Sequence, residues 1–325
     1  FLGIPISGSL TAKYRSKTMV TLAAIFYPLA LINISFANNT SYLAFSLFIF
    51  GVIGNMFNVS VNTQATALAK LFDKSIISTF HGFWSLGGLC GLIFATLIIN
   101  LKITIGYHLG LVAIVSIFVC FVAYFYLLRN DKESTGNKLQ FGKPDNFILY
   151  TGLVVFSAAV CEGGIYDWSS VYFREVVGAE LFTLSYLVFM ISMTISRFFT
   201  DQIITKIGMP KLFVFSAGVI ILGVSILILF PYFYTALLGF FIAGFGVASI
   251  FPMAFLLAGQ SKKYAPGMAI SIVGTYSTLG VLIAPPFIGY LAHVFNLNKA
   301  FLFFIAAALL LFYFSRKAFF YLEKQ

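Results

Sequence analysis

Residues 211–229 are KLFVFSAGVIILGVSILIL, a run in which only the first residue is charged. A helix needs about 20 apolar residues to cross the hydrocarbon core of a bilayer, which is roughly 30 Å thick. Similar runs recur along the chain with short polar hinges between them, and 60% of all residues are hydrophobic whereas 9% are charged. A soluble domain does not need so apolar a composition. The sequence therefore predicts an all-α membrane protein with several crossings.

Ten complete crossings are expected from these runs. They cover residues 18–36, 41–69, 78–99, 107–127, 147–173, 182–205, 211–229, 233–260, 266–292 and 298–320. Residues 1–10 have the composition of the end of a further helix. We therefore expect the sequence to be truncated at its N-terminus.

Basic residues are distributed unevenly between alternate hinges. One set of hinges and the C-terminal tail hold sixteen Lys and Arg residues, whereas the other set holds Lys102, Arg174 and Lys299. Cytoplasmic loops of membrane proteins carry an excess of Lys and Arg. We expect the basic hinges and the C-terminus to lie on the cytoplasmic side of a cell membrane. The net charge of +10 then reflects orientation in the bilayer, and no nucleic-acid partner is expected.

A polar hinge divides the chain into two parts. Residues 129–146 contain Gly, Pro and charges of both signs, a composition typical of a linker. We expect a partial N-terminal helix bundle over 1–128 and a C-terminal six-helix bundle over 147–325.

The two parts contain a repeated pattern. Residues 82–88 (GFWSLGG) and 274–280 (GTYSTLG), 192 positions apart, share two glycines, an aromatic residue and a serine at matching places. The same offset relates Gly54 to Gly246. This predicts a parallel repeat about an axis along the membrane normal. A complete repeat would need roughly 45 further residues before residue 1, so we expect twelve crossings in the intact protein.

The segment 8–17 (GSLTAKYRSK) resembles the hinge signature of the major facilitator superfamily, Gly-x-Leu-x-Asp-basic-x-Gly-basic-basic. It has Ala12 in place of the acid and Arg15 in place of the second glycine. A second copy, RFFTD at 197–201, keeps the acid and is followed by Lys206 and Gly208. The resemblance implies the major facilitator fold, with two six-helix bundles.

Residues 58–64, 78–85 and 162–169 are similar to a bacterial inner-membrane branch near the fucose permeases. This resemblance implies a secondary active transporter and not an enzyme. It places Arg197 and Asp201 in a cytoplasmic gate. From spacing alone, these two residues could equally form a local pair on one helix face, because they are four positions apart.

Two acids lie within the expected crossing 147–173. Ionisable groups at membrane depth are costly, so Glu162 and Asp167 are candidates for a functional site. Tyr166 shares a helix face with Glu162, while Asp167 lies about 140° away, and Gly163 and Gly164 between them are expected to permit a kink or an unwound turn that breaks the helix. Desolvation favours the neutral form of a carboxyl group, which suits an acid that binds and releases a proton. The alternatives are a packing role for Glu162 and a position at the outer rim for Asp167.

Amides and rings supply the remaining candidates. Amide groups both donate and accept hydrogen bonds, which suits a hydroxyl-rich solute or, alternatively, contacts between helices. Aromatic rings stack on ring-shaped solutes or simply pack, and a histidine contacts ligand or a helix end. The candidates of these kinds are Asn55, Asn58, Asn62, Trp84, Tyr166, Trp168, Tyr276 and His81.

These observations predict a carrier that works by alternating access. No nucleotide-binding loop or Cys/His metal cluster is present in the sequence, so we expect no cofactor and no metal. We predict proton-coupled uptake of a small polar solute such as a sugar by a monomer in the lipid bilayer. The alternatives are a proton-coupled exporter of amphipathic compounds and a membrane sensor or scaffold that moves nothing.

Overall fold

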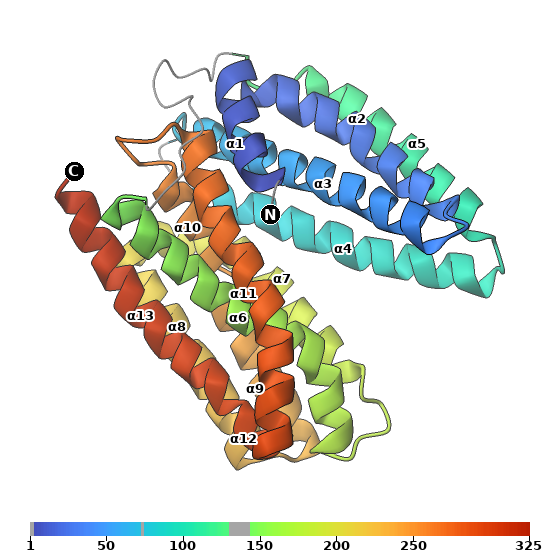
Figure 1. Ribbon diagram of the computed structural model, residues 1–325. Coiled ribbons are helices and arrows are strands. Elements are labelled where there is room, and N and C mark those ends of the chain that lie inside the picture. The colour runs from blue at the N-terminus through green and yellow to red at the C-terminus, as the bar shows by residue number, and fades with distance from the viewer. Residues whose placement is uncertain (1–2, 73–74, 130–143) are drawn as a thin grey trace. The chain divides into compact units, whose positions relative to one another are not determined.

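The computed structural model describes residues 3–72, 75–129 and 144–325, and within these ranges every regular element is a helix. The helices, shown in Figure 1, are α1 (Gly3–Tyr14), α2 (Ser16–Ser35), α3 (Thr40–Ala69), α4 (Ile77–Asn100), α5 (Ile105–Tyr124), α6 (Asn146–Glu175), α7 (Leu184–Ile207), α8 (Met209–Leu229), α9 (Phe233–Val247), α10 (Ile250–Ala258), α11 (Pro266–Val294), α12 (Leu297–Ala300) and α13 (Leu302–Glu323). Ten segments of the described chain are long and apolar enough to cross a membrane. The predicted all-α membrane fold and its ten crossings are confirmed.

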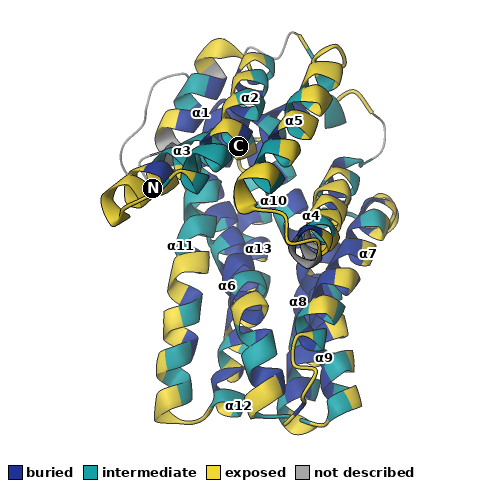
Figure 2. Ribbon diagram, turned by 90° about the vertical axis from the view of Figure 1, so that its right-hand side faces the viewer, coloured by how far each residue is buried: buried dark blue, intermediate teal, exposed yellow. Residues whose placement is uncertain are grey.

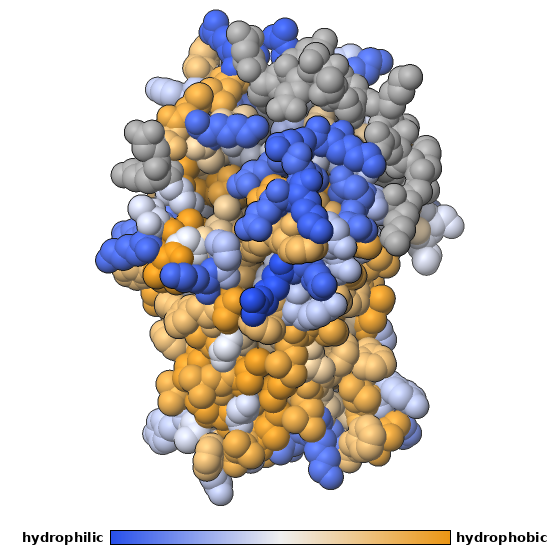
Figure 3. All heavy atoms as spheres, turned by 90° about the vertical axis from the view of Figure 1, so that its left-hand side faces the viewer, coloured by the Kyte–Doolittle hydropathy of each residue, from blue (hydrophilic) through white to orange (hydrophobic). Residues whose placement is uncertain are grey.

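The helices form two compact units. Unit 1 comprises Phe1–Leu71, Leu86–Gly142 and Gly259–Ile272, and unit 2 comprises Phe72–Ser85, Lys143–Ala258 and Val273–Gln325. The start of α4 therefore belongs to unit 2, and the start of α11 belongs to unit 1. Hydrophobic side chains cover much of the face shown in Figure 3, as expected for a surface in contact with lipid.

In unit 1, α2 packs against both α3 and α5, and α1 packs against α3. The ring of Tyr27 on α2 stacks on Phe50 of α3 with centroids 4.5 Å apart. Gly54 lies beside the same tyrosine ring, which would be 2.9 Å from an added Cβ. Almost all residues of α5 are exposed or partly exposed, as the colours of Figure 2 show, which is expected for a helix at the edge of a bundle.

In unit 2, α6 packs against α13 and α8 packs against α9. Glycines allow both contacts, since an added Cβ at Gly164 would lie 2.5 Å from the Phe304 ring and one at Gly223 would lie 2.5 Å from the backbone nitrogen of Ala243. Helix α6 is continuous from Asn146 to Glu175, so the helix break allowed for at Gly163–Gly164 does not occur. The small size of Gly164 serves close packing instead.

The crossing expected as one helix over 233–260 is divided into α9 and α10, with Ala248 and Ser249 between them. Pro252 explains the interruption. Proline has no backbone N–H, so it cannot bond the carbonyl four residues earlier, which here belongs to Ala248. The division therefore leaves one carbonyl oxygen available inside the unit.

Two helix junctions have the same local geometry. One residue, Arg15, joins α1 to α2 with φ 73° and ψ 145°. One residue, Gly208, joins α7 to α8 with φ 80° and ψ 157°. The positive φ angle suits glycine and strains arginine. The same backbone turn thus occurs in both units, one residue away from the repeat offset of 192, with a favoured residue at only one of the two places.

Candidate functional site

The centre of the candidate site is Arg197 on α7, which is 2% exposed. Its Nε donates a hydrogen bond of 3.1 Å to the carbonyl oxygen of Ala248. Its Nη1 donates to Oγ of Ser85, and its Nη2 lies 3.3 Å from Oε1 of Glu162. One buried cation therefore connects α7 to α6, to the start of α4 and to the gap between α9 and α10.

Each partner is supplied by a distinct local feature. The Ala248 carbonyl is available because Pro252 cannot donate to it. Ser85 is the last residue of α4 that belongs to unit 2, and its hydroxyl also donates to the carbonyl of His81 at 3.1 Å. A buried guanidinium is tolerated only when its donors are paired, so these contacts hold Arg197 in one position.

Only one of the two carboxylate oxygens of Glu162, on α6, has a partner among the described residues. Oε1 contacts Arg197, whereas Oε2 is buried and has no hydrogen-bond partner among the described residues. The side chain as a whole is 18% exposed. A buried acceptor without a donor is unfavourable. The arrangement leaves an oxygen that can accept a hydrogen bond from a ligand or hold a proton.

Trp84 adjoins this ion pair. The guanidinium carbon of Arg197 lies 5.7 Å from the centroid of the Trp84 ring, a distance at which a cation is attracted to the ring. Trp84 is nevertheless 66% exposed, so much of the indole remains available to a ligand. His81, one turn earlier on α4, has its ring 6.3 Å from that of Phe255 on α10.

Asp201 forms a separate centre at the beginning of α4. Its carboxylate accepts hydrogen bonds from the backbone nitrogen atoms of Ser78 and Thr79, at 3.1 and 2.7 Å. It also accepts from the hydroxyls of Ser75 and Thr79, at 2.6 and 2.7 Å. Asp201 thus caps the first turn of another helix, where a negative charge is favourable.

The relation between Arg197 and Asp201 is not simply that of neighbours on one helix face. The contacts described for Arg197 lead to α6, to Ala248 and to Ser85. Those described for Asp201 lead to Ser75, Ser78 and Thr79. The two side chains therefore connect α7 to different partners.

The candidates that follow Glu162 along α6 have varied surroundings. Tyr166 accepts a hydrogen bond from the hydroxyl of Tyr186 on α7. Asp167 is exposed. The indole nitrogen of Trp168 donates to the carbonyl of Pro285 on α11 at 3.1 Å, which connects α6 to α11.

Tyr276, a candidate on α11, packs against Gly152 of α6, where an added Cβ would lie 2.5 Å from the tyrosine ring. Trp168 and Tyr276 thus have evident packing roles.

The asparagines of α3 belong to unit 1, whereas Glu162 and Arg197 belong to unit 2. The Asn55 amide donates to the carbonyl of Gly51, and the Asn62 amide donates to the carbonyl of Asn58, both at 2.9 Å. These bonds lie within α3 itself. Asn62 is buried and its amide also donates to Oδ1 of Asn58 at 3.3 Å, whereas the side chain of Asn58 is exposed.

Two residues that contact Arg197 were not among the candidates predicted from the sequence. Ser85 had no charge to mark it, and Ala248 acts through its backbone. A proline inside an apolar crossing, here Pro252, was the available signal for the second. No group of three or more His, Cys, Asp or Glu residues that could hold a metal ion occurs in the described ranges.

Comparisons with known proteins give a consistent result. The family model described as Major Facilitator Superfamily matches residues 1–267. An uncharacterized MFS-type transporter of Yersinia pestis is 28% identical over 302 residues, which cover 92% of this chain and 78% of that protein. The membrane protein MosC of Rhizobium meliloti is 27% identical over 314 residues, 95% of this chain and 76% of that one.

Two solved structures share the fold. The transporter FucP in the outward conformation has a TM-score of 0.79 and 15% identity, with coverage of 98% of this chain and 86% of that chain. The proton:xylose symporter XylE has a TM-score of 0.75 and 14% identity, with coverage of 97% and 83%.

Proposed function

This chain belongs to the major facilitator superfamily, and from that membership we propose that it is a symporter that couples proton entry to uptake of a small polar solute such as a sugar. The family and the relatives make it a multi-pass membrane transporter and not an enzyme. The proposal concerns the coupling ion, the substrate class and the direction of transport.

The open oxygen of Glu162 carries the proposal. With Glu162 ionised, its charge balances that of Arg197 at 3.3 Å, and Oε2 is ready to accept a hydrogen bond. A solute hydroxyl supplies such a donor. Protonation of the carboxylate removes the charge balance and weakens the hold on Arg197, which keeps its bonds to Ala248 and Ser85. One proton therefore changes both the ligand acceptor and the ion pair.

The exposure of the Trp84 ring favours a ring-shaped solute as the substrate. Its indole lies beside Arg197 yet keeps 66% of its surface exposed. Aromatic faces attract the apolar faces of rings, while nearby charges satisfy the polar edges. A monosaccharide presents both kinds of surface. The fold neighbours support the same class, since FucP is a fucose:proton symporter and XylE is a proton:xylose symporter.

Asp201 is the proposed gate. Its carboxylate binds the first turn of α4 through two backbone N–H groups, an interaction that can be made or lost without any chemical step. The sequence around the end of α7 and the sequence just before α4 are both rich in Lys. This favours a position for Asp201 at the cytoplasmic side of the membrane. Making and breaking this contact during alternating access would close and open the cytoplasmic end.

The test is uptake into vesicles that contain the purified full chain. A panel of radiolabelled monosaccharides is offered with an inward proton gradient, an inward sodium gradient or none. We expect the proton gradient alone to drive accumulation of at least one sugar in the wild-type protein. An exporter that exchanges solute for protons would instead accumulate solute under an outward proton gradient, so the sign of the gradient distinguishes the two directions of coupling.

Two variants on α6 sharpen the test. Glu162→Gln keeps the shape but cannot release a proton, so it should lose gradient-driven accumulation while still exchanging labelled for unlabelled solute. Glu175→Gln is the matched control, because Glu175 pairs with Arg174 at 2.8 Å in an exposed ion pair on the same helix. Accumulation by Glu162→Gln at the wild-type level would refute proton coupling through this carboxylate.

A further inference from the structure

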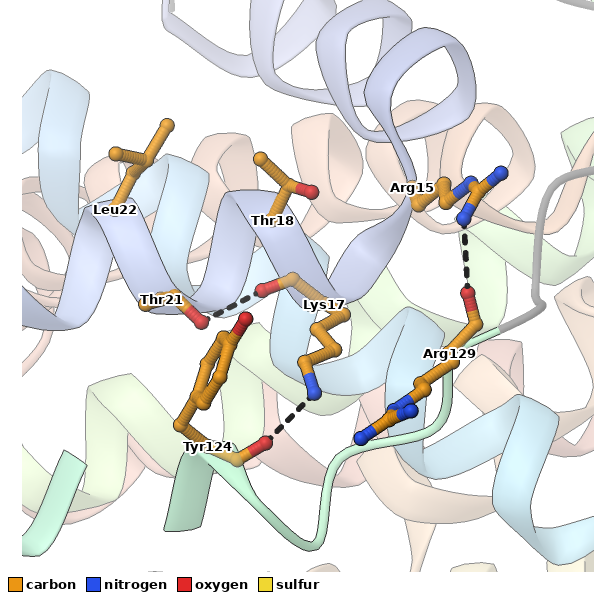
Figure 4. A pocket seen from close by; sticks show the side chains of 7 residues that line it. All are labelled: Arg15, Lys17, Thr18, Thr21, Leu22, Tyr124 and Arg129. Carbon is orange, nitrogen blue, oxygen red and sulfur yellow. Dashed lines mark hydrogen bonds between the residues drawn. The ribbon is translucent and has the colours of Figure 1, made fainter. Parts of the chain in front are cut away.

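A basic hollow in unit 1 is not explained by transport. It has a volume of about 370 Å³ and is formed by the start of α2, the end of α5 and the residues just after α5. Its lining consists of Arg15, Lys17, Thr18, Thr21, Leu22, Tyr124 and Arg129, as Figure 4 shows. Three of these are cations, and none is an acid.

The cations are held in place around this hollow. The amine of Lys17 donates to the carbonyl of Tyr124 at 2.8 Å and lies 3.9 Å from the centroid of its ring. The guanidinium of Arg15 donates to the carbonyl of Arg129 at 3.4 Å. In Figure 4 the side chain of Arg129 extends from this point toward Lys17. These hydrogen bonds of Lys17 and Arg15 go to neutral carbonyls of the described residues, and these contacts do not neutralise the two positive charges.

Gln64 on α3 connects two of the segments that form the hollow. This buried α3 side chain accepts from the backbone nitrogen of Leu128 at 2.7 Å through Oε1. Its Nε2 donates to the hydroxyl of Ser16 at 2.6 Å. Leu128 precedes Arg129, and Ser16 lies between Arg15 and Lys17. One amide therefore sets the position of all three cations.

The first turn of α2 adds further positive potential. Arg15 precedes that turn, and its side chain makes no capping hydrogen bond. The first N–H groups of a helix and its dipole favour an anion. Arg15 also keeps a positive φ of 73° that strains a residue with a side chain, whereas the equivalent turn uses Gly208 at 80°. An arginine retained against this cost is consistent with a use for its charge.

We propose that this hollow binds the phosphate group of an anionic ligand, and that the headgroup of an anionic phospholipid is its source in the membrane. Phosphate accepts hydrogen bonds from several guanidinium and ammonium groups at once. Basic pockets between transmembrane helices are suited to such headgroups.

The surroundings favour a lipid over a soluble phosphate. Leu22 lines the hollow and is 40% exposed, and Phe26 and Leu29 follow it on the same face of α2 at 50% and 44%. Phe121 of α5 and Phe125, the residue after the end of α5, are 64% and 62% exposed. An exposed apolar surface thus leads away from the cationic hollow along both helices, as the acyl chains of a bound lipid require.

The experiment measures the melting temperature of the purified full chain in detergent. Phosphatidylglycerol, phosphatidylcholine or inorganic phosphate is titrated into the wild type, Lys17→Gln, Arg129→Gln and Arg15→Gly. Lys211→Gln is the control, since it removes one exposed charge near the start of α8, the helix that matches α2 in the repeat. Arg15→Gly relieves backbone strain, so this variant should fold even if the others do not.

We expect phosphatidylglycerol to raise the melting temperature of the wild type and of Lys211→Gln. The apparent dissociation constant should increase roughly fivefold for each cation removed from the hollow. A comparable rise with inorganic phosphate, lost in the same variants, would keep the phosphate site but overturn lipid as its source. An equal response in all variants, or none in the wild type, would overturn the site.

Discussion

Glu162 of α6 and Arg197 of α7 form an ion pair of 3.3 Å in which one carboxylate oxygen is used and the other has no partner among the described residues. Arg197 is by contrast held by Ala248 and Ser85 as well. The pair is therefore unequal, because the cation is fixed and the acid is open to a further contact. In the proposed mechanism, Glu162 and not Arg197 is therefore the group that responds to a proton or a solute.

Removal of only one member of the pair should destabilise the protein. Glu162→Leu leaves a buried cation without its counter-charge, which costs about 3 kcal/mol. The double variant Glu162→Leu/Arg197→Met replaces both charges by apolar groups and should recover most of that loss. Thermal unfolding in detergent measures both, and a double variant less stable than Glu162→Leu would contradict this account. Neither variant should transport.

Asp201 should stabilise the first turn of α4. Asp201→Ala removes the acceptor of two backbone N–H groups, at a cost of about 1–3 kcal/mol, whereas Asp201→Asn keeps an oxygen that can still cap. Hydrogen exchange at the amides of Ser78 and Thr79 should accelerate strongly in the alanine variant and slightly in the asparagine variant. Glu180→Ala, at an exposed acid, is the control and should leave exchange unchanged.

The two repeated junctions predict opposite responses to substitution. Arg15→Gly relieves a strained φ of 73° and should raise the unfolding free energy by about 1 kcal/mol. Gly208→Ala introduces that strain at φ 80° and should lower it by about 1–2 kcal/mol. Thermal unfolding without added lipid separates this effect from phosphate binding. A lower melting temperature for Arg15→Gly would show that the contacts of the arginine side chain stabilise the fold by more than the strained backbone destabilises it.

Two glycines of α8 should differ sharply when replaced. An added Cβ at Gly223 would lie 2.5 Å from the backbone nitrogen of Ala243 on α9, so Gly223→Ala should cost about 1–3 kcal/mol. An added Cβ at Gly218 meets no atom within 4 Å, so Gly218→Ala should be neutral or slightly stabilising. Similar melting temperatures for the two variants would show that α8 and α9 can separate at little cost.

The sequence was informative where local composition decides the structure. The run 211–229 predicted a crossing, and α8 occupies Met209–Leu229. The run 233–260 predicted one helix, and the chain there is divided because Pro252 removes a hydrogen-bond donor that hydropathy does not register. Gly163 and Gly164 indicated flexibility, yet α6 is continuous, because a glycine serves close contact with Phe304 as readily as it serves a bend.

The sequence by itself determined that the chain crosses a membrane many times and that Glu162 is a costly residue within it, because bilayer thickness and desolvation act on each segment separately. Only the tertiary structure decided that Glu162 faces Arg197 and that Gln64 aligns Arg129 with the start of α2. The partner of a buried polar group depends on which other helix lies beside it. The spacing of residues along the chain does not determine which helix that is.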